Sequence, residues 1–178
     1  VRVIWAYDEY YSLLVLEDLG LDADHDGVLT AGEKAQLDGF DMAWDPQYAG
    51  DLYVYAGAAE VALSRPVEHS ADLVDGKIVT THTRALDTRL EVAETPVVFR
   101  VYDPSFYTAY HLSLPARIEG REGCTAATVV PDLDAAYDEL RRALAELAPD
   151  QSAEAELGFP EVGSTFAEEI HLTCVPSS

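Results

Sequence analysis

The stretch VEHSADLVDGKIVTTHTRAL, residues 67–86, decides the fold class of this chain. Its two halves are rich in β-branched residues and meet at Asp75-Gly76, a dipeptide typical of tight hairpin turns. Similar runs lie on both sides: DLYVYAG with AEVALS around Gly57, RLEVAE with PVVFRVYD, and TAYHLSLPARIEG followed by CTAATVV. Short strands at this spacing predict an antiparallel sheet or sandwich over residues 51–130.

Helical patterns flank this β-rich body. After a strand-like VRVIWAY, Asp8 can cap a helix that ends at Gly20, and a second short helix is expected from Thr30 to Gly39. The amphipathic stretch LDAAYDELRRALAEL predicts a helix over residues 132–148, and FAEEIHLTC predicts a closing strand over residues 166–175. We therefore expect an α+β fold in a single domain, residues 1–178, with a helix–loop–helix insert over residues 8–40.

Between the two N-terminal helices lies the acidic segment DADHDGVLTAGE, residues 22–33. An EF-hand loop has oxygen ligands at positions 1, 3, 5, 7, 9 and 12, and glycine at position 6. Here Gly27 is the sixth residue, and the predicted ligands are Asp22, Asp24, Asp26, Val28, Thr30 and Glu33. Crowded carboxylates repel one another, and a divalent cation that prefers hard oxygens removes that repulsion. The segment predicts a Ca²⁺ site, which trivalent lanthanides could also occupy.

The alternative is an acidic helix–loop–helix that binds no ion. Thr30 and Glu33 fit a capping box, so this alternative explains two of the residues, but not the three aspartates together with Gly27. His25, at position 4, is expected to point away from the ion. With no second such loop in the sequence, we expect the weak affinity of extracellular sites, with a Kd on the order of 10⁻⁴ to 10⁻³ M, and a structural role.

The charge balance limits the possible partners. With 11 basic and 33 acidic residues, the net charge is −22, which argues against nucleic acids and anionic membranes because both require a basic surface. No apolar run is long enough for a membrane helix, so direct membrane insertion is not expected. The sequence does not set the oligomeric state, although the apolar residue at loop position 8, Leu29, could bridge to another chain.

The two cysteines, Cys124 and Cys174, each lie in a strand-like stretch. In a chain with no thiolate metal motif they favour a disulfide in an exported protein over two buried thiols. The histidines show no close ligand spacing. Neighbouring strands could bring His69 and His82 together in a second metal site, for Zn²⁺, Ni²⁺ or Co²⁺, but strand histidines are more often structural.

The sequence offers little for catalysis. It contains no nucleophile elbow, no glycine-rich phosphate loop, and no acidic pair that stands out as glycosidase-like. The aromatic clusters FDMAWDP and DPSFYTAYH could line a ligand groove, but core packing is the more usual role of such clusters. We therefore expect a protein that is not an enzyme.

Several segments carry a family resemblance that covers nearly the whole chain. WAYDEYYSLLVLEDLGLDADHDGVLTAGE, GFDMAWDP, VTTHTRAL, VVFRVYDPSFYTAYHL and FAEEIHLTC resemble an uncharacterised family of bacterial periplasmic proteins. Its members are labelled as the periplasmic component of an uncharacterised ABC-type transport system. They share the acidic loop, and their genes often lie near nickel, cobalt or zinc transporters. The resemblance implies a periplasmic location and a membrane metal transporter as a partner.

Two functions follow as expectations. The first is an exported, non-enzymatic calcium-binding protein in which one ion orders the helical insert. The second is a periplasmic metal-binding component of a nickel, cobalt or zinc transport system. Members of the resembled family begin with a His-Pro-His segment, whereas this chain starts in a strand-like stretch, so we expect residues to precede Val1 and transition-metal ligands to lie among them.

Overall fold

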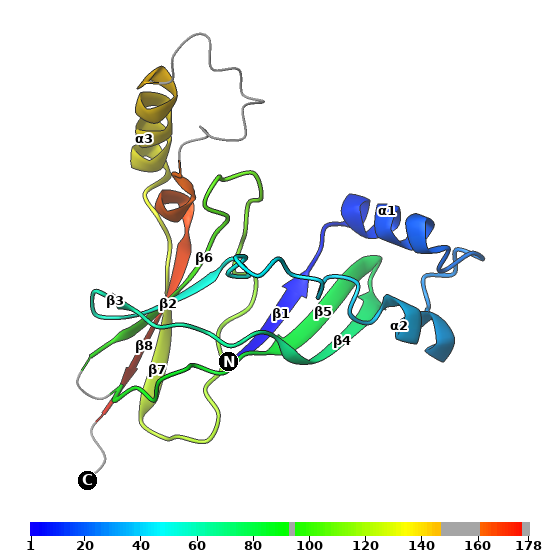
Figure 1. Ribbon diagram of the computed structural model, residues 1–178, viewed down its shortest axis with the longest axis horizontal. Coiled ribbons are helices and arrows are strands. Elements are labelled where there is room, and N and C mark those ends of the chain that lie inside the picture. Colours follow the sequence, from blue (N-terminus) through cyan, green and yellow to red (C-terminus); the bar gives the residue numbers. More distant parts are fainter. Residues whose placement is uncertain (93–94, 147–160, 176–178) are drawn as a thin grey trace. The chain divides into compact units, whose positions relative to one another are not determined.

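The computed structural model describes residues 1–92, 95–146 and 161–175 and shows an α+β fold (Figure 1). The hairpin expected over residues 67–86 is formed by β4 (Val67–Val74) and β5 (Lys77–Thr83). Asp75 and Gly76 have positive φ angles of 50° and 75°, the conformation that a two-residue turn between twisted strands requires. The predicted turn is therefore confirmed.

The chain divides into two compact units. The first comprises residues 1–48 and 63–87, and the second comprises residues 49–62 and 88–178. A domain can contain two such units, so the single domain expected over residues 1–178 stays a prediction. Among the described residues, no helix is both long and apolar enough to cross a membrane.

The first unit is built on a three-stranded antiparallel sheet of order β1-β5-β4, in which β1 spans Arg2–Ala6. Helix α1 (Glu9–Leu19) begins at its N-cap Asp8 and ends at Gly20, which adopts φ 65°, the left-handed conformation that glycine favours. The buried Ser12 ties α1 to the sheet, because its hydroxyl accepts a hydrogen bond of 2.9 Å from the Ile78 amide.

Helix α2 (Ala31–Leu37) follows the acidic segment and ends slightly earlier than expected, at Asp38. Lys34 on this helix forms a 2.7 Å ion pair with Asp72 of β4. Leu37 is fully buried and belongs to a core between the helices and the sheet. That core consists of Leu16, Leu21, Leu29, Leu37, Ala71 and Ile78. The helix–loop–helix is therefore anchored at both ends to one hydrophobic cluster.

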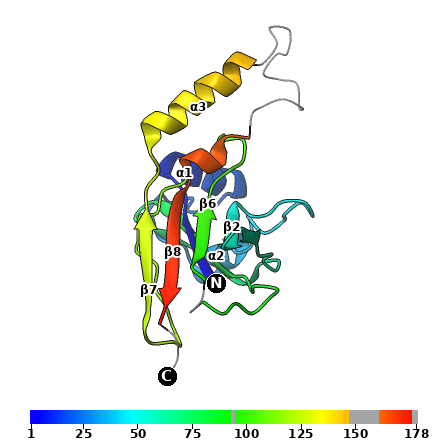
Figure 2. The same ribbon diagram turned by 90° about the vertical axis from the view of Figure 1, so that its left-hand side faces the viewer.

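The second unit contains a five-stranded antiparallel sheet of order β3-β2-β6-β8-β7, and Figure 2 labels β2, β6, β8 and β7 of this sheet. Its strands are β2 (Leu52–Ala56), β3 (Ala59–Glu60), β6 (Val97–Val101), β7 (Cys124–Val129) and β8 (Glu168–Cys174). Helix α3 (Leu133–Glu146) and the short 3₁₀ helix η1 (Gly163–Phe166) share a small core. At its centre, the rings of Phe106 and Phe166 stack with centroids 3.8 Å apart.

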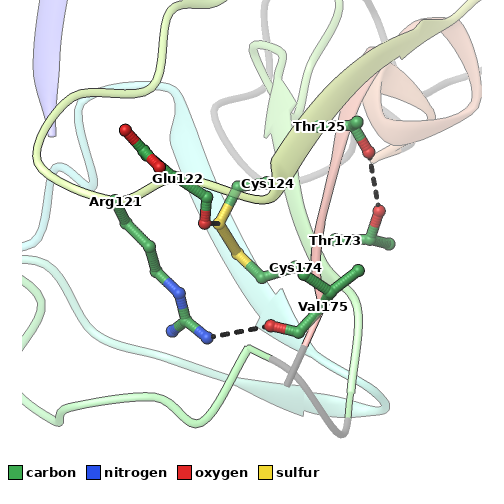
Figure 3. The surroundings of a disulfide bond; sticks show 7 residues. All are labelled: Arg121, Glu122, Cys124, Thr125, Thr173, Cys174 and Val175. Carbon is green, nitrogen blue, oxygen red and sulfur yellow. Dashed lines mark hydrogen bonds between the residues drawn. A yellow bond between two sulfur atoms is a disulfide. The ribbon is translucent and has the colours of Figure 1, made fainter. Parts of the chain in front are cut away.

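The predicted disulfide between Cys124 and Cys174 is present and joins the edge strand β7 to β8 (Figure 3). The two cysteines occupy directly opposite positions of the antiparallel ladder. One step further along, the hydroxyls of Thr125 and Thr173 are hydrogen-bonded at 2.9 Å across the same strands. A covalent link and a cross-strand pair therefore fix the register of β7 on β8.

Two predicted strands are wrong. RLEVAE forms no strand in its described residues, 89–92, because its expected partner β6 already pairs with β2 on one side and β8 on the other. TAYHLSLPARIEG is irregular. Its Leu112 amide donates to the Glu168 carboxylate at 2.6 Å, and Pro115 has no N–H for a ladder. The AEVALS strand shrinks to the two residues of β3.

Candidate metal centre

Three aspartates of the acidic loop lie together between α1 and α2. Each of Asp22, Asp24 and Asp26 offers a carboxylate oxygen, and these oxygens lie within 4.8 Å of one another. Among the described residues, no other group of three or more His, Cys, Asp or Glu side chains meets this condition. These are residues 1, 3 and 5 of the predicted loop, so the local backbone gathers the ligands that the spacing indicated.

Asp22 is the most constrained of the three, and it is only 9% exposed. One of its carboxylate oxygens accepts hydrogen bonds of 3.1 Å from the amides of Asp26 and Gly27. Asp22 also has a positive φ of 50°, which is uncommon for a residue other than glycine. The loop thus folds back over its own first carboxylate, whose orientation is set before any ligand is bound.

Gly27 provides the turn that closes this arrangement. It adopts φ 75°, and a Cβ built at this position meets no atom within 4 Å. Glycine is therefore favoured here by the backbone conformation and not by lack of space. Immediately after it, the Val28 amide donates to a carboxylate oxygen of Asp26 at 2.8 Å. The turn keeps the third aspartate beside the first.

Glu33 and Thr30 form the capping box of α2. The Glu33 carboxylate accepts from the Thr30 amide at 2.8 Å and from the Thr30 hydroxyl at 2.7 Å, while the Glu33 amide donates to that hydroxyl. The other Glu33 oxygen accepts from the Asp22 amide at 2.9 Å. Hydrogen bonding from the Thr30 side chain and backbone, and then from Asp22, lowers the pKa of Glu33, so the carboxylate is ionised at neutral pH.

The loop therefore has its negative charges in place, but Glu33 does not belong to the aspartate cluster. A side-chain rotation from the capping box toward the aspartates would be needed for it to become a ligand. The remaining position, Leu29, is 4% exposed and packs in the core of the first unit. The bridge from this position to another chain, which the sequence suggested, would involve the backbone and stays a prediction. His25 is exposed and lies outside the cluster, as expected.

The two histidines proposed for a second site come from facing strands. The register between β4 and β5 shifts between Val67 and Ser70, which places His82 opposite a bulge that contains His69. His69 Nδ1 pairs with Asp38 at 2.8 Å and is partly exposed. His82 is 1% exposed, and its Nδ1 has no hydrogen-bond partner among the described residues. They do not belong to any three-ligand group in the described part of the chain.

The surroundings of His82 explain the direction of its pKa shift and its packing. Burial lowers the pKa of His82, the positive charges of Arg84 and His69 act in the same direction, and the Asp41 carboxylate opposes them. His82 meets the Trp44 ring edge to face at 5.5 Å, and Arg84 lies over the same ring at 5.2 Å. The aromatic FDMAWDP segment is thus a packing element here, and His82 is neutral at pH 7.

Sequence reasoning did not single out Asp41, which lies within that segment. One of its oxygens accepts hydrogen bonds from the Tyr7 hydroxyl at 2.8 Å and the Thr80 hydroxyl at 2.9 Å. Burial, and then the Asp41 charge, raise the pKa of Tyr7 strongly. Asp41 therefore links the segment after α2 to β5 and to Tyr7, the residue that follows β1. The motif gave no signal for this role, because the partners are distant in sequence.

The fold and loop define a protein in which one unit carries an acidic helix–loop–helix on a small antiparallel sheet and the other unit contains a second antiparallel sheet with a disulfide. A family model described as Protein of unknown function (DUF1007) matches residues 1–174. The chain belongs to this family. No curated protein matches the sequence significantly, and no solved structure matches the fold significantly.

Proposed function

We propose that this protein is an exported, non-enzymatic calcium-binding protein with a single structural site in the loop of residues 22–33. The observation that carries the proposal is the cluster of Asp22, Asp24 and Asp26, whose ligand oxygens lie within 4.8 Å of one another. Such a spacing suits a hard cation that takes six to eight oxygens at 2.3–2.6 Å. The disulfide supports export, because disulfides persist in oxidising compartments.

The remaining ligands come from the same loop. Thr30 and the Val28 carbonyl occupy positions 9 and 7, and Glu33, ionised by its hydrogen bonds, occupies position 12. Binding would turn Glu33 from the Thr30 amide toward the ion, so the ion exchanges a capping interaction for a ligand bond. Lanthanide ions require the same oxygen-rich set and can serve as probes.

The ion would stabilise the arrangement of α1 and α2 by ordering the loop between them. Both helices already pack on one core, through Leu16 of α1 and Leu37 of α2, and the loop adds Leu29 to it. The first unit therefore does not depend on the ion for its hydrophobic contacts. The ion instead relieves repulsion between the aspartates and restricts the loop that joins α1 to α2. We infer a modest stabilisation confined to the first unit.

Calorimetric titration with Ca²⁺ tests the proposal. The wild type should bind one ion, with a Kd on the order of 10⁻⁴ to 10⁻³ M. Asp26→Asn and Glu33→Gln should each weaken binding roughly tenfold or more, because each removes a charged ligand. Glutamine still fits a capping box, so Glu33→Gln preserves the start of α2. The control is Glu119→Gln, an exposed acid in the second unit.

Two titration results would contradict coordination of Ca²⁺ by the loop. Absence of saturable Ca²⁺ or Tb³⁺ binding by the wild type would overturn the proposal. Equal weakening by Glu33→Gln and Glu119→Gln would also overturn it, because it would indicate general attraction to an acidic surface in place of coordination by the loop.

A second candidate is a periplasmic metal-binding component of a nickel, cobalt or zinc transport system. One observation favours it: the buried His82 Nδ1 has no hydrogen-bond partner among the described residues, and His82 lies opposite the bulge that contains His69 in the strand register. Two imidazole nitrogens suit Zn²⁺ or Ni²⁺ better than Ca²⁺. Titration with Zn²⁺ should then show one calcium-independent site that His69→Gln abolishes and His25→Gln does not. Unchanged Zn²⁺ binding by His69→Gln would remove this candidate.

A further inference from the structure

The outer edge of the second sheet is formed by β7, whose only strand partner in the described chain is β8 (Figure 2). Its sequence, CTAATV, contains no charged residue and no proline. Natural edge strands usually carry such residues, or are very short or bulged, because an open edge can pair with another chain. The opposite edge, β3, is two residues long. β7 is six residues long and has none of these protective features.

The hydrogen-bond pattern shows which backbone groups of β7 face outward. The Val175 amide donates to the Gly123 carbonyl at 2.9 Å, so this opposite pair is hydrogen-bonded. Pairs alternate along an antiparallel ladder, and therefore Thr125 and Ala127 also bond to β8. The N–H and C=O groups of Ala126 and Thr128 point away from β8, and no hydrogen bond joins them to another described residue.

A pocket of about 300 Å³ lies where β7 ends and α3 begins. Part of its wall is apolar and is formed by Val129, Pro131 and Ala136. The charged residues in its lining are all acidic: Asp132, Glu139 and Glu169, with no lysine, arginine or histidine among the lining residues.

The three acids differ in how far their charges are already balanced. Glu169 is ion-paired with Arg100 at 2.6 Å and lies within hydrogen-bonding distance of His171 Nε2, at 2.5 Å. Asp132 accepts a hydrogen bond from the Ala135 amide at the start of α3, and Glu139 is exposed. Asp132 and Glu139 therefore supply negative charge that no basic residue of the pocket offsets.

The geometry points to β7 as a docking edge for an extended basic segment of another protein. The segment pairs as an added strand with the outward groups of Ala126 and Thr128, and a lysine or arginine side chain enters the acidic pocket at the end of the strand. Strand addition takes its affinity from the main chain and its specificity from the side-chain pocket. A second copy of this chain is the poorer occupant, because it would bring a charge of −22 against −22.

The test uses a synthetic peptide, the N-acetylated and C-amidated octapeptide (Thr-Arg)₄, added to the isotope-labelled full chain. Saturable shifts of the Ala126 and Thr128 amides in NMR spectra are expected, with none for (Thr-Glu)₄. Thr128→Pro removes an outward N–H that β8 does not use, so the sheet tolerates it, yet affinity should fall at least about tenfold. Thr128→Val keeps that N–H and should bind like the wild type.

A charge comparison separates pocket recognition from general attraction. The double variant Asp132→Asn/Glu139→Gln should lower affinity roughly fivefold at low salt, since exposed charge pairs are each weak. The asparagine still caps α3. The matched control, Asp138→Asn/Glu119→Gln, removes the same charge outside the pocket and should leave affinity nearly unchanged.

Three results would overturn the inference. The first is no saturable binding at about 1 mM peptide, which is the range of a weak single-strand contact. The second is equal loss in both double variants or equal affinity of Thr128→Pro and Thr128→Val. The third is self-association of the chain that Thr128→Pro abolishes, which would assign the edge to a second copy.

Discussion

Removal of the Cys124–Cys174 disulfide should destabilise the second unit and leave its fold in place. The bond joins residues separated by 50 positions. In the chain-entropy treatment, closing a loop of this length disfavours the unfolded state by roughly 4 kcal/mol. The β7–β8 ladder has six register pairs, of which the cysteine pair is one, so the strands keep their other contacts. Cys124→Ser/Cys174→Ser should therefore lower the free energy of unfolding by about 4 kcal/mol.

Urea denaturation can measure this loss unit by unit. Both tryptophans, Trp5 and Trp44, lie in the first unit, so tryptophan fluorescence follows that unit alone. Hydrogen exchange of the β7 and β8 amides follows the second unit. With a urea dependence of about 2 kcal/mol per molar, the midpoint of the second unit should fall by roughly 2 M. The reduced wild type should show the same midpoint as the double variant.

The control for this experiment is Thr125→Ala, which removes the hydroxyl contact with Thr173 next to the disulfide. It keeps the covalent link and should cost less than about 1 kcal/mol. An unchanged midpoint in the double cysteine variant would refute the entropic reasoning. A fluorescence transition that shifts together with the exchange data would show that both units unfold as the single domain expected from the sequence.

Three further predictions concern the first unit. Leu37→Ala empties a fully buried position and should cost about 3 kcal/mol by tryptophan fluorescence; a cost below about 1 kcal/mol would contradict the assigned core. Because burial lowers the pKa of His82 in the folded state, the unfolded chain binds the proton first, and stability should fall as pH drops below about 6.5. His82→Gln should flatten that dependence, and an equally steep profile would refute it. In about 10 mM Ca²⁺, well above the expected Kd, excess chelator should lower the fluorescence midpoint of the wild type more than that of Asp26→Asn; equal shifts would contradict the site.

The β-hairpins that matched the sequence prediction are marked by residue patterns within the hairpins themselves. Asp75-Gly76 sets the β4–β5 turn, and the alternation of buried and exposed residues along β5 fixes its inner face. RLEVAE has an equally strand-like composition and still forms no strand over its described residues, because both edges of β6 are occupied. The composition of one segment shows that it favours a strand. Whether a neighbouring strand has a free edge to pair with it depends on the whole sheet.

In the candidate site, too, local features could be predicted from the sequence and long-range contacts could not. The spacing of Asp22, Asp24 and Asp26 is local, so their gathering could be predicted from the loop pattern. The position of the Glu33 carboxylate could be predicted only as one of two alternatives, because the same side chain fits a capping box and a ligand position. The role of Asp41 could not be predicted, since its partners Tyr7 and Thr80 are 34 and 39 residues away.

The order of strands in the second sheet has a consequence for synthesis. The last strand of the described chain, β8, lies inside the sheet, between β6 and β7. While the chain is being made from its N-terminus, β6 and β7 have no shared neighbour until residues 168–174 emerge. The first unit, in contrast, has all its strands by residue 83. Vectorial folding therefore completes the strands of the helix–loop–helix unit early. It leaves β6 with one unpaired edge, and β7 without a strand partner, until the C-terminal strand is made.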